Sequence, residues 1–351
     1  LRNYTISAGG KTYKIYRGDM HRHTDISLDG AGDGNLWDAY RYMLDAAGMD
    51  YFLVTDHHSG NNQEYTWWRI EKSEDMFHVP DLFVTLFGYE RSVGYPNGHR
   101  NLIFTRRGVR TLPNAPGEPK GSSGPILYPY LKKLNGIATS HTSHTGMGTD
   151  WRDNDPELEP IVEIFQGART SAEHEGAPLA PTEQRTDLWA GGYRPLGFVW
   201  NAWAKGYKLG VQASSDHVGA HTAYANVLTD DPSRRGLVEA MRKRHTYAST
   251  DLIILDYRMD DPSTGPHLMG DIFATKSVPK ILVKIIGTAP IQAVHLIKNN
   301  KFIFTRSPAA REFSFEFVDN EPAAGESYYY VRVEQSDGEL AWSSPIWVRR
   351  E

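Results

Sequence analysis

Short apolar runs of strand length recur from the N-terminus to about residue 260, and most of them end at histidine or carboxylate residues. The runs Tyr51–Thr55 and Gly136–Ser140 are examples. Between such runs lie segments whose apolar side chains recur every three or four residues, as in Leu36–Gly48 and Gly236–Thr246, and this spacing is typical of helices. The alternation predicts βαβ units and an α/β fold. Polar residues that end parallel strands gather at one edge of such a fold.

The pattern changes after about residue 265. Short β-type runs follow one another, and Asn299-Asn300 and Asp337-Gly338 are hairpin signals. We therefore predict two domains, an α/β domain over residues 1–265 that begins with a short hairpin, and a small antiparallel β-sandwich-like domain over residues 266–351. The chain length of 351 residues agrees with this division.

Composition narrows the classes of partner. The sequence has no cysteine, which excludes disulfides and thiolate zinc sites. The net charge of −5 and the pI near 6.3 argue against a broad basic surface, so we expect a small-molecule substrate and no large nucleic-acid partner. No apolar run approaches the roughly 20 residues of a membrane span. We expect a location outside the cytoplasm if a signal peptide has been removed, and a cytoplasmic one otherwise. The sequence predicts no oligomeric state.

Histidines are concentrated at the ends of the predicted strands. Nine of the 14 fall into five clusters, at 21–23, 57–58, 99, 141–144 and 217–221. His21 and His23 point the same way if their segment is extended, so they can bind one ion together. Imidazole with carboxylate is the ligand set for zinc, iron and manganese. Neighbouring ions need a bridging carboxylate, and Glu90 is the natural candidate. We predict two or three divalent transition metal ions (Zn, Mn or Fe).

These motifs resemble those of the PHP (polymerase and histidinol phosphatase) superfamily of metal-dependent phosphoesterases. The matching residues are His-Arg-His (21–23), Asp29, Thr-Asp-His (55–57), Glu90, Gly-His (98–99), Ser-His (140–141) and Ser-Asp-His (215–217). The resemblance spans about residues 18–250. Longer strings at 148–155, 162–169 and 213–217 are similar to the carbaryl-hydrolase-like (CehA/McbA-type) branch.

The resemblance implies a distorted (β/α)7 TIM-like barrel with a multinuclear site. The ligands it implies are His21, His23, Glu90 and Asp216 for one ion, Glu90, His99 and His141 for a second, and Asp29, His57 and His217 for a third. Many members of the superfamily end with Asp-any-His, whereas Asp216 and His217 are adjacent in this chain. Either the strand end is shaped differently, or His221 takes the place of His217.

The chemistry predicted for such a site is hydrolysis. A metal-bridging hydroxide would attack a phosphoester or a carboxyl or carbamate ester, with Glu90, Asp216 and His217 as catalytic residues. The residues predicted to contact substrate are Arg100, Arg169, His58 and His144. The alternative is a glycan- or protein-binding module with a structural metal. Structural sites are closed, whereas this sequence offers more ligands than one closed site needs, which favours catalysis.

Overall fold

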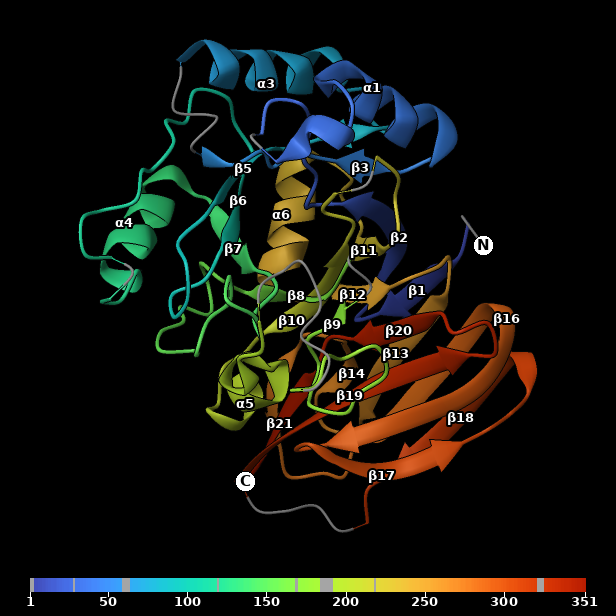
Figure 1. Cartoon of the computed structure of the whole chain (residues 1–351). Helices are drawn as coiled ribbons and strands as arrows, with labels where there is room; N and C mark the ends of the chain where they lie inside the picture. Colours follow the sequence, from blue (N-terminus) through green and yellow to red (C-terminus); the bar gives the residue numbers. More distant parts are fainter. Residues whose placement is uncertain are drawn as a thin grey trace.

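The computed structural model describes residues 3–27, 29–58, 64–118, 120–167, 170–183, 192–217, 219–320 and 325–351. Helices α1 and α3 lie at one end of the molecule, and the C-terminal strands lie at the other (Figure 1). The described helices are α1 (Leu36–Arg41), continued by the π-helical turn η2 (Tyr42–Ala46), α3 (Glu64–Met76), α4 (Gly124–Leu134), α5 (Val199–Ala204), α6 (Arg234–Arg242) and the short 3-10 turns η1 (Gly30–Gly32) and η3 (Pro195–Gly197).

The larger sheet contains strands from both ends of the chain. Its hydrogen-bonded order is β14 (Gly265–Leu268), β13 (Ile254–Asp261), β16 (Lys280–Lys298), β19 (Gly325–Gln335), β20 (Leu340–Ser343), β12 (Thr246–Ser249), β11 (Tyr224–Thr229), β2 (Lys11–Asp19), β3 (Tyr51–Phe52) and β4 (Val84–Thr85). Paired to this path are β1 (Thr5–Ala8), β17 (Lys301–Arg306), β18 (Ala310–Val318), β21 (Ile346–Arg350) and β15 (Ile272–Thr275). The β1–β2 pair is the N-terminal hairpin expected from the sequence.

The histidine clusters at 99, 141–144 and 217–221 lie next to strands of the smaller sheet. Its order is β10 (Gly210–Ser214), β8 (Ile161–Gln166), β7 (Ile137–Ser140), β6 (Arg100–Phe104) and β5 (Phe87–Arg91), with β9 (Thr170–Ser171) paired to β8. The β10–β8 and β8–β7 pairs are parallel, whereas the β7–β6 and β6–β5 pairs are antiparallel. The chain therefore makes an α/β structure as predicted, but not by regular βαβ repetition.

The two sheets do not form the closed seven-stranded barrel that the resemblance implies. Among the described residues each sheet is open, and single bridges join them at two places, Arg22 with Asp216 and His57 with Glu90. Three of the four bridge residues lie just beyond strand ends, and Glu90 is the penultimate residue of β5; all are predicted metal ligands except Arg22, which lies between two of them. The site thus lies where the sheets meet.

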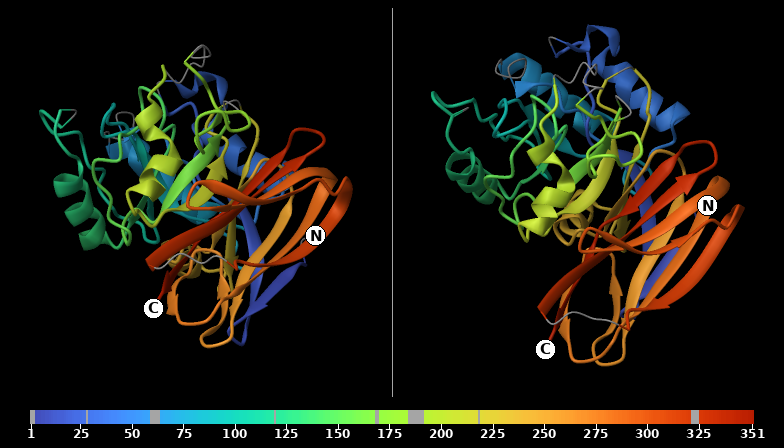
Figure 2. Two further views of the ribbon diagram at one scale, coloured as in Figure 1. Left: turned by 90° about the horizontal axis from the view of Figure 1, so that it is seen from below. Right: turned by 60° about the horizontal axis from the view of Figure 1, so that its bottom comes forward.

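The C-terminal strands share a sheet and a core with the N-terminal part. The predicted boundary between residues 265 and 266 falls inside the antiparallel β13–β14 hairpin. One apolar cluster contains Ile15 and Leu228 together with Val331 and Val333. In both views of Figure 2 the C-terminal strands, orange and red, lie beside the N-terminal hairpin, blue. The β-sandwich-like part is therefore packed against the α/β part through a continuous buried layer.

Candidate metal centre

The backbone first brings the ends of β2 and β10 together. The Asp216 N–H donates to the His21 carbonyl at 2.7 Å, and the His23 N–H donates to the Asp216 carbonyl at 3.2 Å. This pairing places both histidines against the Asp216 side chain. The loop after β2 is also held by Asp56, whose carboxylate accepts from the N–H and the hydroxyl of Thr24, both at 2.7 Å.

Adjacent Asp216 and His217 both reach the cluster because the strand does not continue through them. In an extended chain, neighbouring side chains point to opposite faces. Asp216 has a φ of 61°, in the left-handed region, which breaks that alternation. Asp216 and His217 therefore fit without the intervening residue of the usual motif. His221 lies elsewhere, with its ring nitrogens beside the hydroxyls of Tyr42 at 3.0 Å and Tyr224 at 2.8 Å.

Glu90 lies at the centre of the cluster, and its two carboxylate oxygens face different histidines. Oε2 is 3.2 Å from His21 Nε2 and 3.0 Å from His23 Nε2. Oε1 is 2.6 Å from His99 Nδ1 and 3.4 Å from His141 Nε2. One carboxylate thus joins two separate groups of nitrogen donors.

The first donor group has the dimensions of a metal site. Donor atoms of His21, His23, Glu90 and Asp216 lie 3.0–3.3 Å from one another along the five edges measured. Four ligands at about 2.0–2.2 Å from a zinc ion in tetrahedral geometry would be about 3.3–3.6 Å apart. The Nε2 atoms of His21 and His23 are only 3.3 Å apart, a close approach that a shared cation explains.

Buried polar atoms without hydrogen bonds support the same interpretation. Within the described residues, His99 Nδ1, His141 Nε2 and Asp216 Oδ1 are buried, and although each lies within 3.4 Å of a group in the cluster, none forms a hydrogen bond of acceptable geometry. An unsatisfied buried polar atom is costly, and a bound ion is one accepted way to satisfy it. The donor set of imidazoles and carboxylates therefore fits divalent transition metal ions in both groups around Glu90.

A third group lies on the more open side of the cluster. It contains His23, Asp29 and His217, with His57 beside it. The side chain of Asp29 is 48% exposed, and its Oδ2 is 2.7 Å from His57 Nε2 and 3.6 Å from His217 Nε2. His21, His23 and Glu90 are by contrast almost completely buried. The cluster is therefore closed at its core and accessible along this side.

The electrostatics of the cluster favour charged groups despite its burial. Burial lowers the pKa of His23 and His57, but their bonds to carboxylates outweigh it and raise the pKa values to about 9 and about 10. Burial raises the pKa of Glu90, yet the surrounding His141, His57 and His99 hold it well below its usual range. Histidines that carry protons in this way release them when a metal binds.

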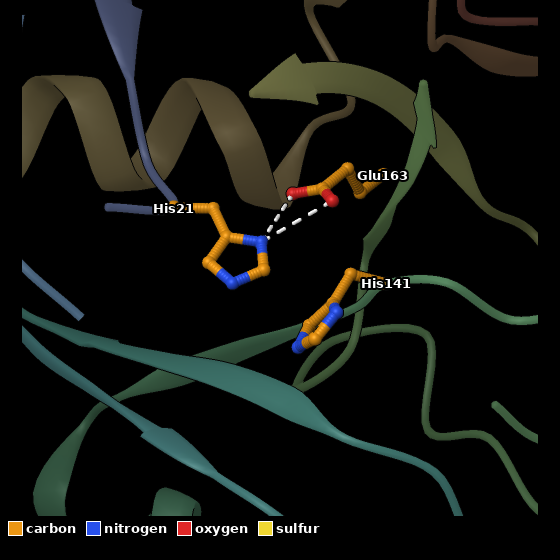
Figure 3. Close-up of side chains that lie close together, drawn as sticks. All are labelled: His21, His141 and Glu163. Carbon is orange, nitrogen blue, oxygen red and sulfur yellow. Dashed lines mark hydrogen bonds and ion pairs between the residues drawn. The ribbon is translucent and has the colours of Figure 1, made fainter. Parts of the chain in front are cut away.

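The outer ring nitrogens of the ligands contact residues that sequence reasoning did not assign. Glu163 on β8 lies at 3.1 Å from His21 Nδ1, Ser27 Oγ at 2.9 Å from His23 Nδ1, and Asp33 Oδ2 at 2.7 Å from His217 Nδ1. Figure 3 shows Glu163 with His21 and His141. The available signal for Glu163 was a carboxylate inside an apolar run, in the string Val162–Gln166.

Two of the predicted substrate-binding residues have structural contacts instead. The Arg100 guanidinium is buried, donating to Glu159 at 3.0 Å and to the carbonyl of Asn97 at 2.7 Å, so it is not available to clamp an anion. The sequence predicted that Arg100 contacts substrate because it was expected to follow a strand end. In the structure, Glu159 neutralises its charge in the interior. His58 is also buried, and its Nδ1 accepts the Ser92 N–H at 3.2 Å.

The remaining two predictions are placed differently. His144 is buried and stacked on Phe198 with ring centroids 5.1 Å apart, and burial lowers its pKa to about 3. It is therefore a neutral imidazole within the core. Arg169 lies outside the described residues, and its role stays a prediction.

Comparison with known proteins identifies relatives without an assigned function. No family model matches the chain. Uncharacterized proteins of Chlamydia trachomatis, Chlamydia muridarum and Chlamydia pneumoniae are 27%, 26% and 25% identical over 90% of this chain. The chain spans about half the length of these curated relatives, covering 55%, 55% and 54% of them.

Two solved structures are also similar. A two-domain protein of Bacteroides vulgatus, described as containing a predicted PHP-like metal-dependent phosphoesterase, is 14% identical with a TM-score of 0.47, covering 98% of this chain and 99% of that one. The lesion-specific endonuclease EndoQ of Pyrococcus furiosus is 13% identical with a TM-score of 0.36, covering 65% of this chain and 56% of that one. No described helix is both long and apolar enough to cross a bilayer.

Proposed function

We propose that this chain is a metal-dependent hydrolase that cleaves phosphoesters of a small molecule. The observation that carries the proposal is the division of Glu90, with one oxygen facing His21 and His23 and the other facing His99 and His141. A carboxylate shared in this way would bind two neighbouring ions at once. Paired ions are used by phosphatases, polymerases, nucleases and aminopeptidases, where they stabilise both the attacking and the leaving oxygen.

Each of the proposed ligand residues then has a definite role. His21, His23 and Asp216 would hold one ion, His99 and His141 the other, and Glu90 both. Bound divalent ions would supply Lewis acidity and lower the pKa of coordinated water. The protein holds its donor atoms within 3.0–3.3 Å of one another in the buried group, so little rearrangement is needed when the site is filled.

We assign leaving-group protonation to His217. His58 and His144 have lowered pKa values, with burial the largest cause in each case, so they are neutral near pH 7. His217 lies at the accessible side, and burial lowers its pKa, but the nearby carboxylates of Asp29 and Asp216 raise it overall. Two carboxylates, Asp29 and Asp33, flank its ring. A protonated His217 can therefore donate to a leaving oxygen, and in this proposal it is not a permanent ligand of a third ion.

The alternative, a binding module with a structural metal, is less consistent with the geometry. A structural site is closed by protein ligands, whereas a catalytic one keeps an open position. Here Asp29 is half-exposed, and it contacts two histidines of the cluster. An accessible side allows a substrate to reach the site, whereas a structural ion does not require one.

A panel of chromogenic substrates tests the proposal. Protein loaded with zinc or manganese is assayed with an aryl phosphate monoester, an aryl phosphate diester and an aryl carboxyl ester. We expect turnover of one of the phosphate esters that is lost on chelation and restored by metal. Hydrolysis of the carboxyl ester alone would replace the phosphoester assignment, and chelator-resistant activity or no activity on any member would contradict a metallohydrolase.

A further inference from the structure

A buried carboxylate lies behind His21, on the side of the ring opposite the donor cluster. Both oxygens of Glu163 approach His21 Nδ1, at 3.2 Å and 3.1 Å, and both side chains are fully buried. His21 Nε2 instead faces Glu90 Oε2 and Asp216 Oδ1, each at 3.2 Å. Figure 3 shows Glu163 beside Nδ1, with the other ring nitrogen pointing away. The two nitrogens of one imidazole thus have separate partners.

The hydrogen bonds beyond Glu163 anchor its side chain. Ser214 Oγ accepts the Met20 N–H at 3.3 Å and donates to Gln212 Oε1 at 2.6 Å. Gln212 Nε2 in turn donates to Glu163 Oε2 at 3.0 Å. Glu163 accepts this bond, and its two oxygens also lie within 3.2 Å of His21 Nδ1, where they can accept the ring N–H.

We propose that Glu163 is a positioning residue that holds His21 in the tautomer with the proton on Nδ1, leaving the Nε2 lone pair for a metal ion. Ligating histidines commonly donate their second N–H to such a carboxylate, which fixes the ring and makes it a stronger ligand. The relay ends at the Met20 backbone, next to His21 itself, so Glu163 is also anchored to the segment that it orients. The inference rests on the proposed metal site.

Comparison with the neighbouring ligand shows what a carboxylate contributes at this position. His23 shares the same ion site, but its Nδ1 faces the hydroxyl of Ser27 at 2.9 Å. A hydroxyl can serve as donor or acceptor, so it does not select one tautomer of His23. Both oxygens of Glu163 instead lie against His21 Nδ1, and one of them already accepts from Gln212, so this side chain favours a proton on Nδ1.

The test compares metal affinity in three variants with that of the wild type. Glu163→Gln offers one acceptor oxygen where two donors arrive, so one hydrogen bond is lost. Glu163→Gln combined with Gln212→Glu again gives every bond in the relay a donor and an acceptor, with the bond between positions 212 and 163 reversed, and it moves the carboxylate to position 212. Glu159→Gln is the matched control, because Glu159 is a buried carboxylate that pairs with Arg100 and not with a histidine ligand.

Affinity is measured by zinc competition against a chromophoric chelator on metal-free protein. We expect Glu163→Gln to bind its tightest zinc about 10- to 100-fold more weakly, the double variant to recover part of that loss, and Glu159→Gln to lie within twofold of the wild type. Glu163→Gln affinity within twofold of the wild type would overturn the proposal, as would an equal loss in Glu159→Gln.

Nitrogen-15 NMR of the zinc-loaded protein gives a second, independent readout. The His21 ring should show a protonated Nδ1 and a metal-bound Nε2 in the wild type, and a Nδ1 proton that exchanges faster in Glu163→Gln. A proton on Nε2 in the wild type would contradict the proposal. Neither readout requires turnover: a wild type that binds zinc but hydrolyses no ester refutes the proposed function only, and a wild type that binds no zinc refutes the positioning role.

Discussion

Replacing Glu90 by glutamine should weaken both metal sites at once. Glu90 is the residue shared between the two donor groups, with Oε2 facing His21 and His23 and Oε1 facing His99 and His141 at distances of 2.6–3.4 Å. Glutamine keeps the shape of the side chain but removes the charge and leaves one coordinating oxygen. A change in any other ligand of these two groups would affect one ion directly, whereas this one affects two.

The size of the effect follows from the burial of the network. Glu90 is 1% exposed, and removing one partner of a buried charged network costs about 3–5 kcal/mol. At about 1.4 kcal/mol per tenfold change, this corresponds to a loss of roughly 10²-fold to several 10³-fold in affinity. The metal-free protein should also lose stability at neutral pH, because the pKa of Glu90 is depressed. Its stabilising effect is present above the usual carboxylate pKa and disappears as the pH falls through the lower folded-state value.

The assay is a zinc competition titration of metal-free Glu90→Gln protein. Glu74→Gln is the matched control: Glu74 is also fully buried, but it accepts the Val54 N–H and contacts no ligand histidine. Burial raises the pKa of Glu74 well above its usual range, which favours the neutral carboxyl, and an amide has the same shape. We expect the control to bind zinc within twofold of the wild type. If Glu90→Gln kept both affinities, or lost only one, the bridging arrangement would be wrong.

Four further predictions follow from the same geometry. Zinc binding near pH 7 should release protons, because the pKa values of His23 and His57 lie at about 9 and about 10 without metal. Calorimetry in two buffers of different ionisation enthalpy measures this proton release. If no protons were released, the protonated state of these histidines would be contradicted. Since these pKa values are raised, the stabilisation they give the metal-free protein is complete below about pH 6.5 and is lost as the pH rises through 9–10, so its thermal midpoint should fall over that range. His217→Gln should lower turnover about 10²- to 10⁴-fold without reducing zinc content; loss of one zinc equivalent would instead make His217 a ligand. Arg100→Gln should cost about 3–5 kcal/mol in unfolding free energy, because it leaves the Glu159 carboxylate without its guanidinium partner. The KM for a phosphate ester should not change. A KM raised more than threefold would indicate that Arg100 contacts the substrate.

Local patterns predicted most of the individual elements. The helix expected over Leu36–Gly48 is α1 with its π-helical continuation, and the helix expected over Gly236–Thr246 is α6, which ends earlier, at Arg242. The expected strand Gly136–Ser140 corresponds to β7, and the expected strand Tyr51–Thr55 begins with β3. These segments are specified by their own apolar spacing and by nearby turn residues, which is the information a single sequence contains.

Pairing between distant segments was harder to predict. Short β-type runs were expected after about residue 265, but Lys280–Lys298 forms one long strand, β16, that continues through a register shift. An antiparallel β5–β6–β7 arrangement replaces the regular parallel order of a barrel. Both differences depend on which strands meet in space, and the apolar pattern along one strand does not specify its partner.

The same limit explains which site residues the sequence revealed. Histidines at strand ends were conspicuous because polar residues seldom follow apolar runs in such numbers. No role was assigned to Glu163 because its role depends on its contact with His21, a residue far away in the sequence. Arg100 was misassigned because its partner Glu159 lies 59 residues away along the chain. The left-handed backbone conformation at Asp216 lets two adjacent side chains reach the cluster. The sequence around it, serine before and histidine after, does not signal this conformation.

Metal content per chain, measured on protein purified without chelator, tests the central claim most directly. Inductively coupled plasma mass spectrometry of the wild type and of Glu90→Gln gives the stoichiometry and its dependence on the bridging carboxylate. Two tightly held transition metal ions per wild-type chain, with both depleted in Glu90→Gln, are the predicted result. One ion or fewer in the wild type, or two ions retained in Glu90→Gln, would contradict a dinuclear centre built around Glu90.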